Sequence, residues 1–171
     1  MPKLRPLDPE RDGKALHAIF GDEECCRYMT KPANASVEET IRDLKKWTTG
    51  LEDTSWAIVE EPDGEALGRV ALFSGGQPDV WEVGIMIVPS AQGKGLATGA
   101  LAQAIDIAFD RLGARRIYAD IDPDNTASLR AFEKLGFQRE GLLRAAWDTH
   151  IGIRDSVIMG LLPGDPRPWK P

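Results

Sequence analysis

The segment from Ala91 to Ala100 reads A-Q-G-K-G-L-A-T-G-A, and it constrains the fold more than any other part of the chain. An apolar run, Val83 to Val88, comes before it and is ended by Pro89. A helical pattern follows, with apolar residues on one face at Leu101, Ile105, Ala108 and Leu112. The order is therefore strand, glycine-rich turn and helix. Such a turn gathers backbone N–H groups at a helix N-terminus, where the dipole adds positive potential, so we expect an anion here, most often a phosphate.

Composition indicates an ordinary globular protein of one domain. The chain has 171 residues, of which 42% are hydrophobic and 28% charged, which suits a single core over residues 1–171. No apolar run approaches the ~18 residues of a membrane span, and the N-terminus has no signal-peptide core. We therefore expect a cytoplasmic protein without a membrane partner. The net charge of −6, without a long cluster of Lys and Arg, argues against a nucleic-acid partner.

Periodicity and turn residues predict helices and strands in a single unit. Asp8 followed by Pro9 is typical of a helix start, and Ser36 with Glu39 has the spacing of a capping box. Strands are expected over residues 3–7, 55–60, 66–74, 80–88, 116–121, 137–144 and 151–162. Because helical patterns come both before and between these strands, we expect an α/β or α+β fold with a mixed sheet. The segment 163–171 holds four prolines, and we expect no regular structure there.

Two familiar phosphate-binding turns do not fit the glycine-rich segment. A Walker turn needs G-x-x-x-x-G-K-[ST], but Lys94 stands before the second glycine and no Ser or Thr follows a G-K pair in that register. A dinucleotide turn needs G-x-G-x-x-G, and counted from Gly93 the third glycine position holds Thr98. The acidic residue expected about 20 positions further on is also missing, because residues 113–118 contain no acid.

A third phosphate-binding turn, Q/R-x-x-G-x-G/A, does fit, with Gln92, Gly95 and Ala97 in order and spacing. With this turn, and with the later segment E-K-L-G-F at residues 133–137, the chain resembles the GNAT superfamily of N-acetyltransferases. The pairing of Asn125 with Ser128 and the ending R-D-S-V-I-M-G-L-L resemble its Rim-type branch, which includes ribosomal-protein N-terminal acetyltransferases. The resemblance covers nearly the whole chain.

The resemblance implies a central mixed sheet of about six to seven strands flanked by about four helices, with a splay between the strands on either side of the glycine-rich turn. It implies acetyl-CoA as co-substrate, no metal, and an N–H near Ile87 that faces the thioester oxygen. Arg130 and Lys134 are candidates for the 3′-phosphate of the cofactor, and a solvated helix face explains them equally well. The residues expected to hold the cofactor are Met86, Ile87, Val88, Gln92, Gly93, Lys94, Gly95, Leu96, Ala97, Thr98, Asn125, Ser128 and Lys134.

Two residues are candidates for the chemistry of acetyl transfer. Glu82 is an acid in an otherwise apolar strand, and many relatives place a catalytic glutamate there; partial burial would raise its pKa toward the range useful to a base. Many relatives carry a tyrosine as general acid in the helix that follows Asn125, but the matching position here is Phe132. Ser128 has the nearest hydroxyl on that helix, and we expect it to stabilise the departing thiolate. A solvent-facing Glu82 and a merely capping Asn125 remain alternatives.

The acceptor is an amine whose identity the sequence leaves open: a protein N-terminus, a polyamine or other small amine, or an antibiotic. The candidate residues for its cleft are Tyr28, Trp81 and Trp147, although aromatic residues are more often part of a core. We expect direct attack without an acyl-enzyme, because we expect neither Cys25 nor Cys26 to lie near the glycine-rich motif, and both are expected to be reduced packing residues. The alternative is a non-catalytic acyl-CoA-binding sensor. A homodimer is also expected.

Overall fold

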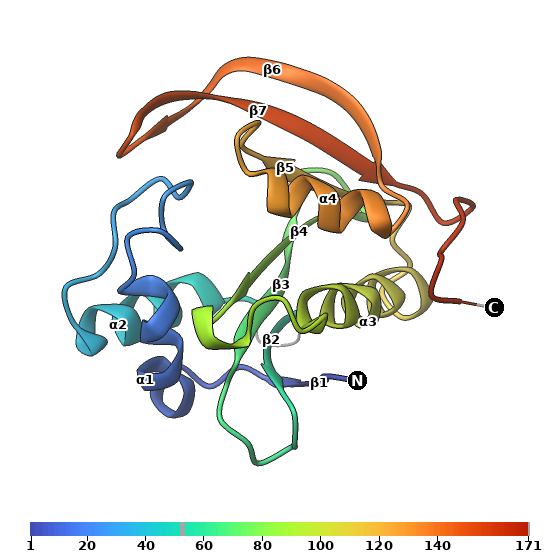
Figure 1. The fold of residues 1–171 in the computed structure, drawn as a ribbon. Coiled ribbons are helices and arrows are strands. Elements are labelled where there is room, and N and C mark those ends of the chain that lie inside the picture. The colour runs from blue at the N-terminus through green and yellow to red at the C-terminus, as the bar shows by residue number, and fades with distance from the viewer. Residues whose placement is uncertain (52–53, 171) are drawn as a thin grey trace.

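A seven-stranded mixed sheet forms the centre of the molecule (Figure 1). The computed structural model describes residues 1–51 and 54–170. The elements in chain order are β1 (Lys3–Pro6), α1 (Pro9–Phe20), α2 (Val37–Thr48), β2 (Ser55–Val59), β3 (Gly68–Ser74), β4 (Val80–Ile87), a 3₁₀ turn η1 (Pro89–Ala91), α3 (Leu96–Asp110), β5 (Arg116–Ile121), α4 (Thr126–Lys134), β6 (Gln138–Thr149) and β7 (Gly152–Leu161). Every residue of β2 is buried, so both faces of the sheet are covered there. The predicted fold class is confirmed.

The sheet opens between its two central strands. Its order is β1-β2-β3-β4-β5-β7-β6, and only β4 and β5 run parallel to each other. Strand β3 pairs with β4 from Trp81 to Ile87, whereas β5 pairs with β4 only from Val80 to Glu82. Beyond Glu82 the two strands diverge (Figure 1). This is the splay that the resemblance implied, and it leaves one edge of β4 without a neighbouring strand.

The first two helices begin where local sequence signals place them. The Asp8 carboxylate accepts from the N–H groups of Glu10 and Arg11, and Pro9 occupies the first turn. Ser36 caps α2 by accepting from the N–H of Glu39. The capping box is incomplete, because the Glu39 carboxylate accepts from the N–H of Ala35 rather than from that of Ser36.

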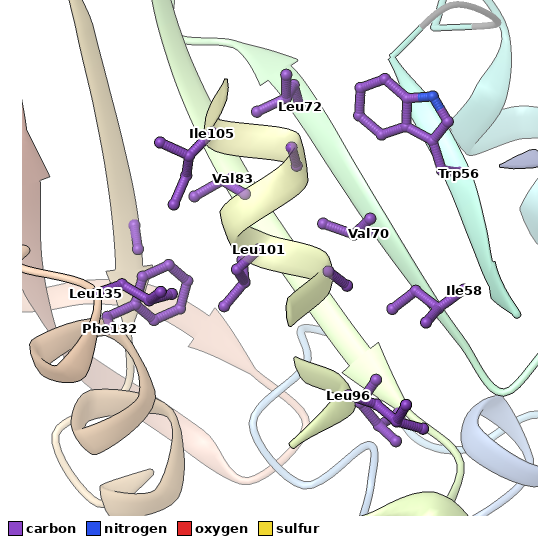
Figure 2. Packing of buried hydrophobic residues seen from close by; sticks show 14 of the residues in the cluster. Trp56, Ile58, Val70, Leu72, Val83, Leu96, Leu101, Ile105, Phe132 and Leu135 are labelled. Carbon is purple, nitrogen blue, oxygen red and sulfur yellow. The ribbon is translucent and has the colours of Figure 1, made fainter. Parts of the chain in front are cut away.

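Helix α3 is fixed on the sheet by a continuous apolar core. Leu101 and Ile105 of α3 are fully buried, and Figure 2 shows them beside Val83 of β4, Phe132 of α4 and Leu135, the residue after α4. Burying a Leu or Ile side chain contributes about 1.5–3 kcal/mol. Because these residues anchor α3 directly after the glycine-rich turn, they also fix the position of that turn relative to β4.

The C-terminal segment after β7 has no helix or strand in its described part, as expected, yet it is anchored to α3. Arg167 and Trp169 both hydrogen-bond the carboxylate of Asp106, and Lys170 forms an ion pair with Asp110. Pro171 lies outside the described residues. The last two strands form a longer hairpin than the sequence predicted, since β6 continues to Thr149. No helix in the described part of the chain is long and apolar enough to cross a bilayer.

Candidate active site

The glycine-rich turn is an exposed loop with two residues in left-handed conformation. Gly93 has φ of 75° and Gly95, the residue before α3, has φ of 76°. A Cβ built on either glycine meets no atom within 4 Å, so conformation rather than crowding requires glycine here. No side chain of the described residues caps the N-terminus of α3. The first N–H groups of α3 therefore remain available to an anion at the positive end of the helix.

The free edge of β4 presents backbone groups toward the splay. The N–H of Val88 donates to Leu67 on the β3 side, and backbone groups alternate along a strand, so those of Ile85 and Ile87 point the other way. The Ile87 carbonyl accepts from the side-chain amide of Gln92 at 3.2 Å, which ties the glycine-rich turn to the strand. An extended amide-containing ligand can pair with such an edge as an added strand does.

A cavity of about 150 Å³ lies in the splay. Val83, Gly84 and Ile85 of β4, residues 119–122, Tyr28, and Asn125, Ser128 and Phe132 line it. The Asn125 side-chain oxygen accepts from the N–H of Ser128 at 3.2 Å, so Asn125 is the N-cap of α4, and its NH₂ group is still able to donate to a ligand. The structure thus brings Asn125 and Ser128 to the free edge of β4.

A second cavity, of about 210 Å³, adjoins the first and is acidic. Tyr28, Asp120 and Asp122 line both cavities. The second is completed by Met29, Thr30, Glu82, Trp147, Thr149, Arg154 and Asp155. Among these lining residues Arg154 is the one cation, and it is already paired with Asp122 at 2.8 Å and with Asp124 at 2.5 Å. The negative charge of the remaining carboxylates is therefore not compensated within the lining.

Glu82 is a half-buried carboxylate at the last paired position of β4 with β5. Burial raises the pKa of Glu82, and the negative charge of Asp120 raises it further. The Tyr118 hydroxyl donates to the Glu82 carboxylate at 3.3 Å and partly opposes this rise in pKa. A carboxyl group with a raised pKa is better matched to accepting a proton near neutral pH than an exposed one.

Of the three aromatic residues predicted for the acceptor cleft, Tyr28 and Trp147 lie at one cavity and Trp81 does not. The Tyr28 hydroxyl donates to the Asp124 carbonyl at 3.2 Å, and the Trp147 indole N–H donates to both oxygens of Asp120, at 3.2 and 3.0 Å. Both residues line the acidic cavity. Trp81 lines neither cavity: one residue before Glu82 on the same strand, it lies on the opposite face of the sheet and packs against the core.

The other cofactor residues predicted from the turn divide into exposed and buried ones. Gln92, Gly93, Lys94 and Gly95 are exposed, and the Thr98 hydroxyl donates to the Gly95 carbonyl at 3.0 Å. The Leu96 side chain is buried in the core, so only its backbone groups can serve a ligand. Val88 is buried as well, and both of its backbone groups are engaged, the N–H with the Leu67 carbonyl and the carbonyl with the N–H of Ala91, so the structure does not offer Val88 to the cofactor. Lys134 lies exposed in the last turn of α4 and lines neither cavity.

The expected distance between the cysteines and the glycine-rich motif is wrong. The loop after α1 folds back, and the Cys25 sulfur lies 4.0 Å from the side-chain nitrogen of Gln92. Cys25 is nevertheless a poor nucleophile, because burial and the neighbouring Asp22 raise its pKa to about 11. Both cysteines are free thiols, and Cys26 is a buried packing residue. The raised pKa of Cys25, and not its distance from the glycine-rich motif, therefore disfavours an acyl-cysteine.

Four charged residues that line the acidic cavity were missed in the sequence: Asp120, Asp122, Arg154 and Asp155. Tyr118, which hydrogen-bonds Glu82, was missed too. A signal existed for two of them. The strand R-I-Y-A-D-I alternates polar and apolar residues, which places Tyr118 and Asp120 on one face. The sequence offers no comparable signal for Arg154 and Asp155, because their approach depends on how the β6–β7 hairpin crosses the splay.

Comparison with known proteins agrees with this geometry. A family model described as "Acetyltransferase (GNAT) domain" matches residues 3–138. The chain is 36% identical over 160 residues to the spermidine N(1)-acetyltransferase of Escherichia coli (strain K12), covering 92% of this chain and 83% of that protein. It is 29% identical over 139 residues to an uncharacterized N-acetyltransferase, YoaA, of Bacillus subtilis (strain 168), covering 79% and 78% of the two chains.

Solved structures share the fold over nearly the whole chain. A probable GNAT acetyltransferase from Chromobacterium violaceum superposes with a TM-score of 0.82 at 29% identity, covering 93% of this chain and 81% of that one. A spermidine N-acetyltransferase from Vibrio cholerae, crystallised with CoA and spermine, superposes with a TM-score of 0.77 over 94% of this chain and 95% of that one. Its identity of 24% makes that likeness one of fold.

Proposed function

Because the chain belongs to the GNAT family and is an N-acetyltransferase that uses acetyl-CoA, we propose that its acceptor is a small cationic primary amine of the polyamine type. The acidic cavity beside Glu82 carries this proposal. Four carboxylates line it against one arginine that is already paired. An aliphatic polycation would gain Coulomb attraction from every unpaired carboxylate.

The size of the cavity supports the same acceptor class. Its volume of about 210 Å³ is below the ~300–1,000 Å³ typical of pockets for drug-sized ligands. A slim alkylamine is therefore better matched to it than a bulky aminoglycoside antibiotic. The spermidine acetyltransferase among the relatives favours the same class. The Rim-type branch and a protein N-terminus as acceptor stay predictions from the sequence.

In this proposal, the first cavity holds the thioester end of acetyl-CoA and the acidic cavity holds the acceptor amine. Acetyl-CoA, as co-substrate, supplies the thioester. We assign its diphosphate to the N–H groups of residues 93–98, since the N–H of Gln92 donates to the Pro89 carbonyl. We assign its pantetheine arm to the free edge of β4 and to Asn125, and its thioester oxygen to the N–H of Ile87. Glu82 accepts the proton that the acceptor ammonium must lose before its nitrogen can attack. The Ser128 hydroxyl, which lines the first cavity, donates to the departing thiolate.

A non-catalytic sensor of acyl-CoA is the alternative, and Phe132 is the observation that favours it, because this residue lacks the hydroxyl of the usual general acid. Against it stands the half-buried Glu82 with its raised pKa, since a sensor has no need of a base.

Thiol release from acetyl-CoA, measured with a panel of amines, tests the proposal. The panel contains spermidine, putrescine, butylamine, an aminoglycoside and a tripeptide amide with a free N-terminus. We expect the largest kcat/KM for spermidine or putrescine, with butylamine at least about tenfold lower, since one missing charge contact is worth about 1.4 kcal/mol or more. A preference for the tripeptide would contradict the polyamine class. Calorimetric binding of CoA with no turnover of any amine would support the sensor instead.

We also propose that a second copy of the chain covers the β6–β7 hairpin. Strand β6 is an edge of the sheet, and Leu142, Leu143, Trp147, Ile151 and Ile153 on this hairpin are between 44% and 62% exposed. Exposed apolar side chains in one region mark interaction surfaces. Sedimentation velocity should show a dimer, and the substitution Leu142→Glu should shift it to monomer. The two free cysteines fit a reducing compartment, so we assign the protein to the cytoplasm.

A further inference from the structure

Asp120 lies where the two cavities meet, and among the residues that the structure describes its charge has no cationic partner. It extends from β5, lines both cavities, and stands two positions beyond Tyr118, the residue paired with Glu82. Its carboxylate accepts from the Trp147 indole N–H and from the Ser156 hydroxyl. Both donors are neutral, and in the described part of the chain no Lys, Arg or His forms an ion pair with Asp120.

The other carboxylates of the acidic cavity are engaged differently. Asp122 receives two hydrogen bonds from the Arg154 guanidinium, at 2.8 and 2.9 Å, which neutralise its charge. Asp155 accepts from the N–H of Ala145 at 2.7 Å, and it lines the second cavity but not the first. Of the lining carboxylates, therefore, only Asp120 combines an uncompensated charge with a place on both cavities.

We propose that Asp120 is the residue that positions the reacting nitrogen: it binds the primary ammonium of the acceptor between its own carboxylate and that of Glu82. This inference rests on the proposed function and extends it to a residue that the sequence did not indicate. A carboxylate has about four acceptor positions, so the two donors on Asp120 leave room for an N–H of the ammonium. Trp147 and Ser156 hold the carboxylate in place before the acceptor arrives.

The proton step that follows is simple. One N–H bond of the ammonium breaks, its proton passes to a Glu82 oxygen directly or through one water, and the electron pair stays on nitrogen. The neutral amine then faces the first cavity, where the thioester is expected. Asp120 also acts on Glu82 itself, because its negative charge disfavours the ionised form of Glu82 and so raises the affinity of Glu82 for a proton.

Other groups around Glu82 do not raise its proton affinity as the charge of Asp120 does. Tyr118 donates a hydrogen bond to Glu82 and lowers its pKa. Arg154 and Asp122 form an ion pair with each other, and Asp155 lies on the hairpin. Tyr28 and Trp147, which also line the cavity, are neutral. The charge of Asp120 is therefore the one whose removal should change the pH dependence of Glu82.

The substitution Asp120→Asn tests both roles, because it removes the charge while keeping the size and one oxygen acceptor. We expect KM to rise about 10- to 100-fold for putrescine and for butylamine alike, as suits the loss of a hydrogen bond to a charged group. The acidic limb of the kcat/KM profile should move to lower pH. The affinity for CoA should stay unchanged. The control Asp148→Asn makes the same charge change on exposed β6, lines neither cavity, and should leave KM and the profile unaltered.

The outcomes separate this inference from the proposed function. If the wild-type protein acetylates putrescine and Asp120→Asn keeps its KM and its acidic limb, the inference is overturned while the function stands. A rise in KM for putrescine alone would also overturn it, since Asp120 would then bind the distal ammonium. If the wild type acetylates no amine, the proposed function has failed. If Asp120→Asn does not fold, Trp147→Phe provides the test, because it removes one hydrogen-bond donor from the Asp120 carboxylate. We then expect KM for the amine to rise a few-fold while kcat stays unchanged.

Discussion

Replacing Gly95 by alanine isolates what the glycine-rich turn does for ligand binding. Gly95 has φ of 76°, and the added Cβ would meet no atom within 4 Å, so strain comes from backbone conformation alone. Left-handed conformation costs an L-residue about 1–2 kcal/mol. Alanine also lowers the conformational entropy of the unfolded chain, and this offsets about 0.4–1 kcal/mol of the cost. We therefore expect a net loss of about 1 kcal/mol, which for a chain of this size lowers Tm by about 2–4 °C.

Gly113 provides the matched control for this experiment. It has φ of 67°, and a Cβ there also meets no atom within 4 Å, but it lies after the C-terminal end of α3. Both substitutions should therefore lower Tm equally in a thermal melt followed by circular dichroism. In calorimetric titrations with CoA, however, only Gly95→Ala should weaken binding, by about tenfold or more, because hydrogen bonds from N–H groups to a charged acceptor are worth about 1.5–3 kcal/mol. Equal CoA affinity of Gly95→Ala and Gly113→Ala would refute the assignment of the diphosphate to this loop.

Three further substitutions test the chemistry and the core. Glu82→Gln should lower kcat and remove the acidic limb of its pH profile; an unaltered profile would exclude Glu82 as base. In thermal melts, the Tm of this variant relative to the wild type should be higher at pH 8 than at pH 4. The pKa of Glu82 is raised in the folded state, so the wild-type protein loses stability as pH rises from the unfolded pKa of Glu82 through its folded pKa, and the variant lacks this loss. Ser128→Ala should lower kcat, and full kcat would exclude a role at the thiolate. Leu101→Ala, at a fully buried position, should cost about 2–5 kcal/mol by chemical denaturation, and a smaller loss would contradict its place in the core.

The divergence of β4 and β5 connects the fold to the chemistry. Central strands normally satisfy each other's backbone groups, but here the pairing of β4 with β5 ends at Glu82. The unpaired edge is what an extended ligand can use, and the space beside it contains both cavities. The acid on β4 stands at the point where pairing ends, between the expected thioester and the acidic cleft. A strand that paired along its whole length would leave no room for either substrate.

Local signals in the sequence predicted the starts of two helices and the glycine-rich turn, which depend on short stretches of chain. Asp8 and Ser36 begin helices because each accepts from N–H groups two or three residues away. The glycine-rich segment predicted a turn at a helix N-terminus, and Gly93 and Gly95 there adopt the positive φ that few other residues reach at low cost. An acid in an otherwise apolar strand, together with the family resemblance, singled out Glu82 as a candidate base.

Tertiary structure decided which carboxylates lie beside Tyr28 and Trp147 in the acidic cavity. Asp120 is 38 residues from Glu82 in the chain, and Trp147 and Asp155 reach the same cavity only because β7 pairs with β5 and the hairpin then bends across the splay. Cys25 approaches Gln92 for the same kind of reason, through an irregular loop that no periodicity describes. Contacts of this kind are set by strand order and by the direction of loops and hairpins, which depend on the packing of the whole core rather than on neighbouring residues.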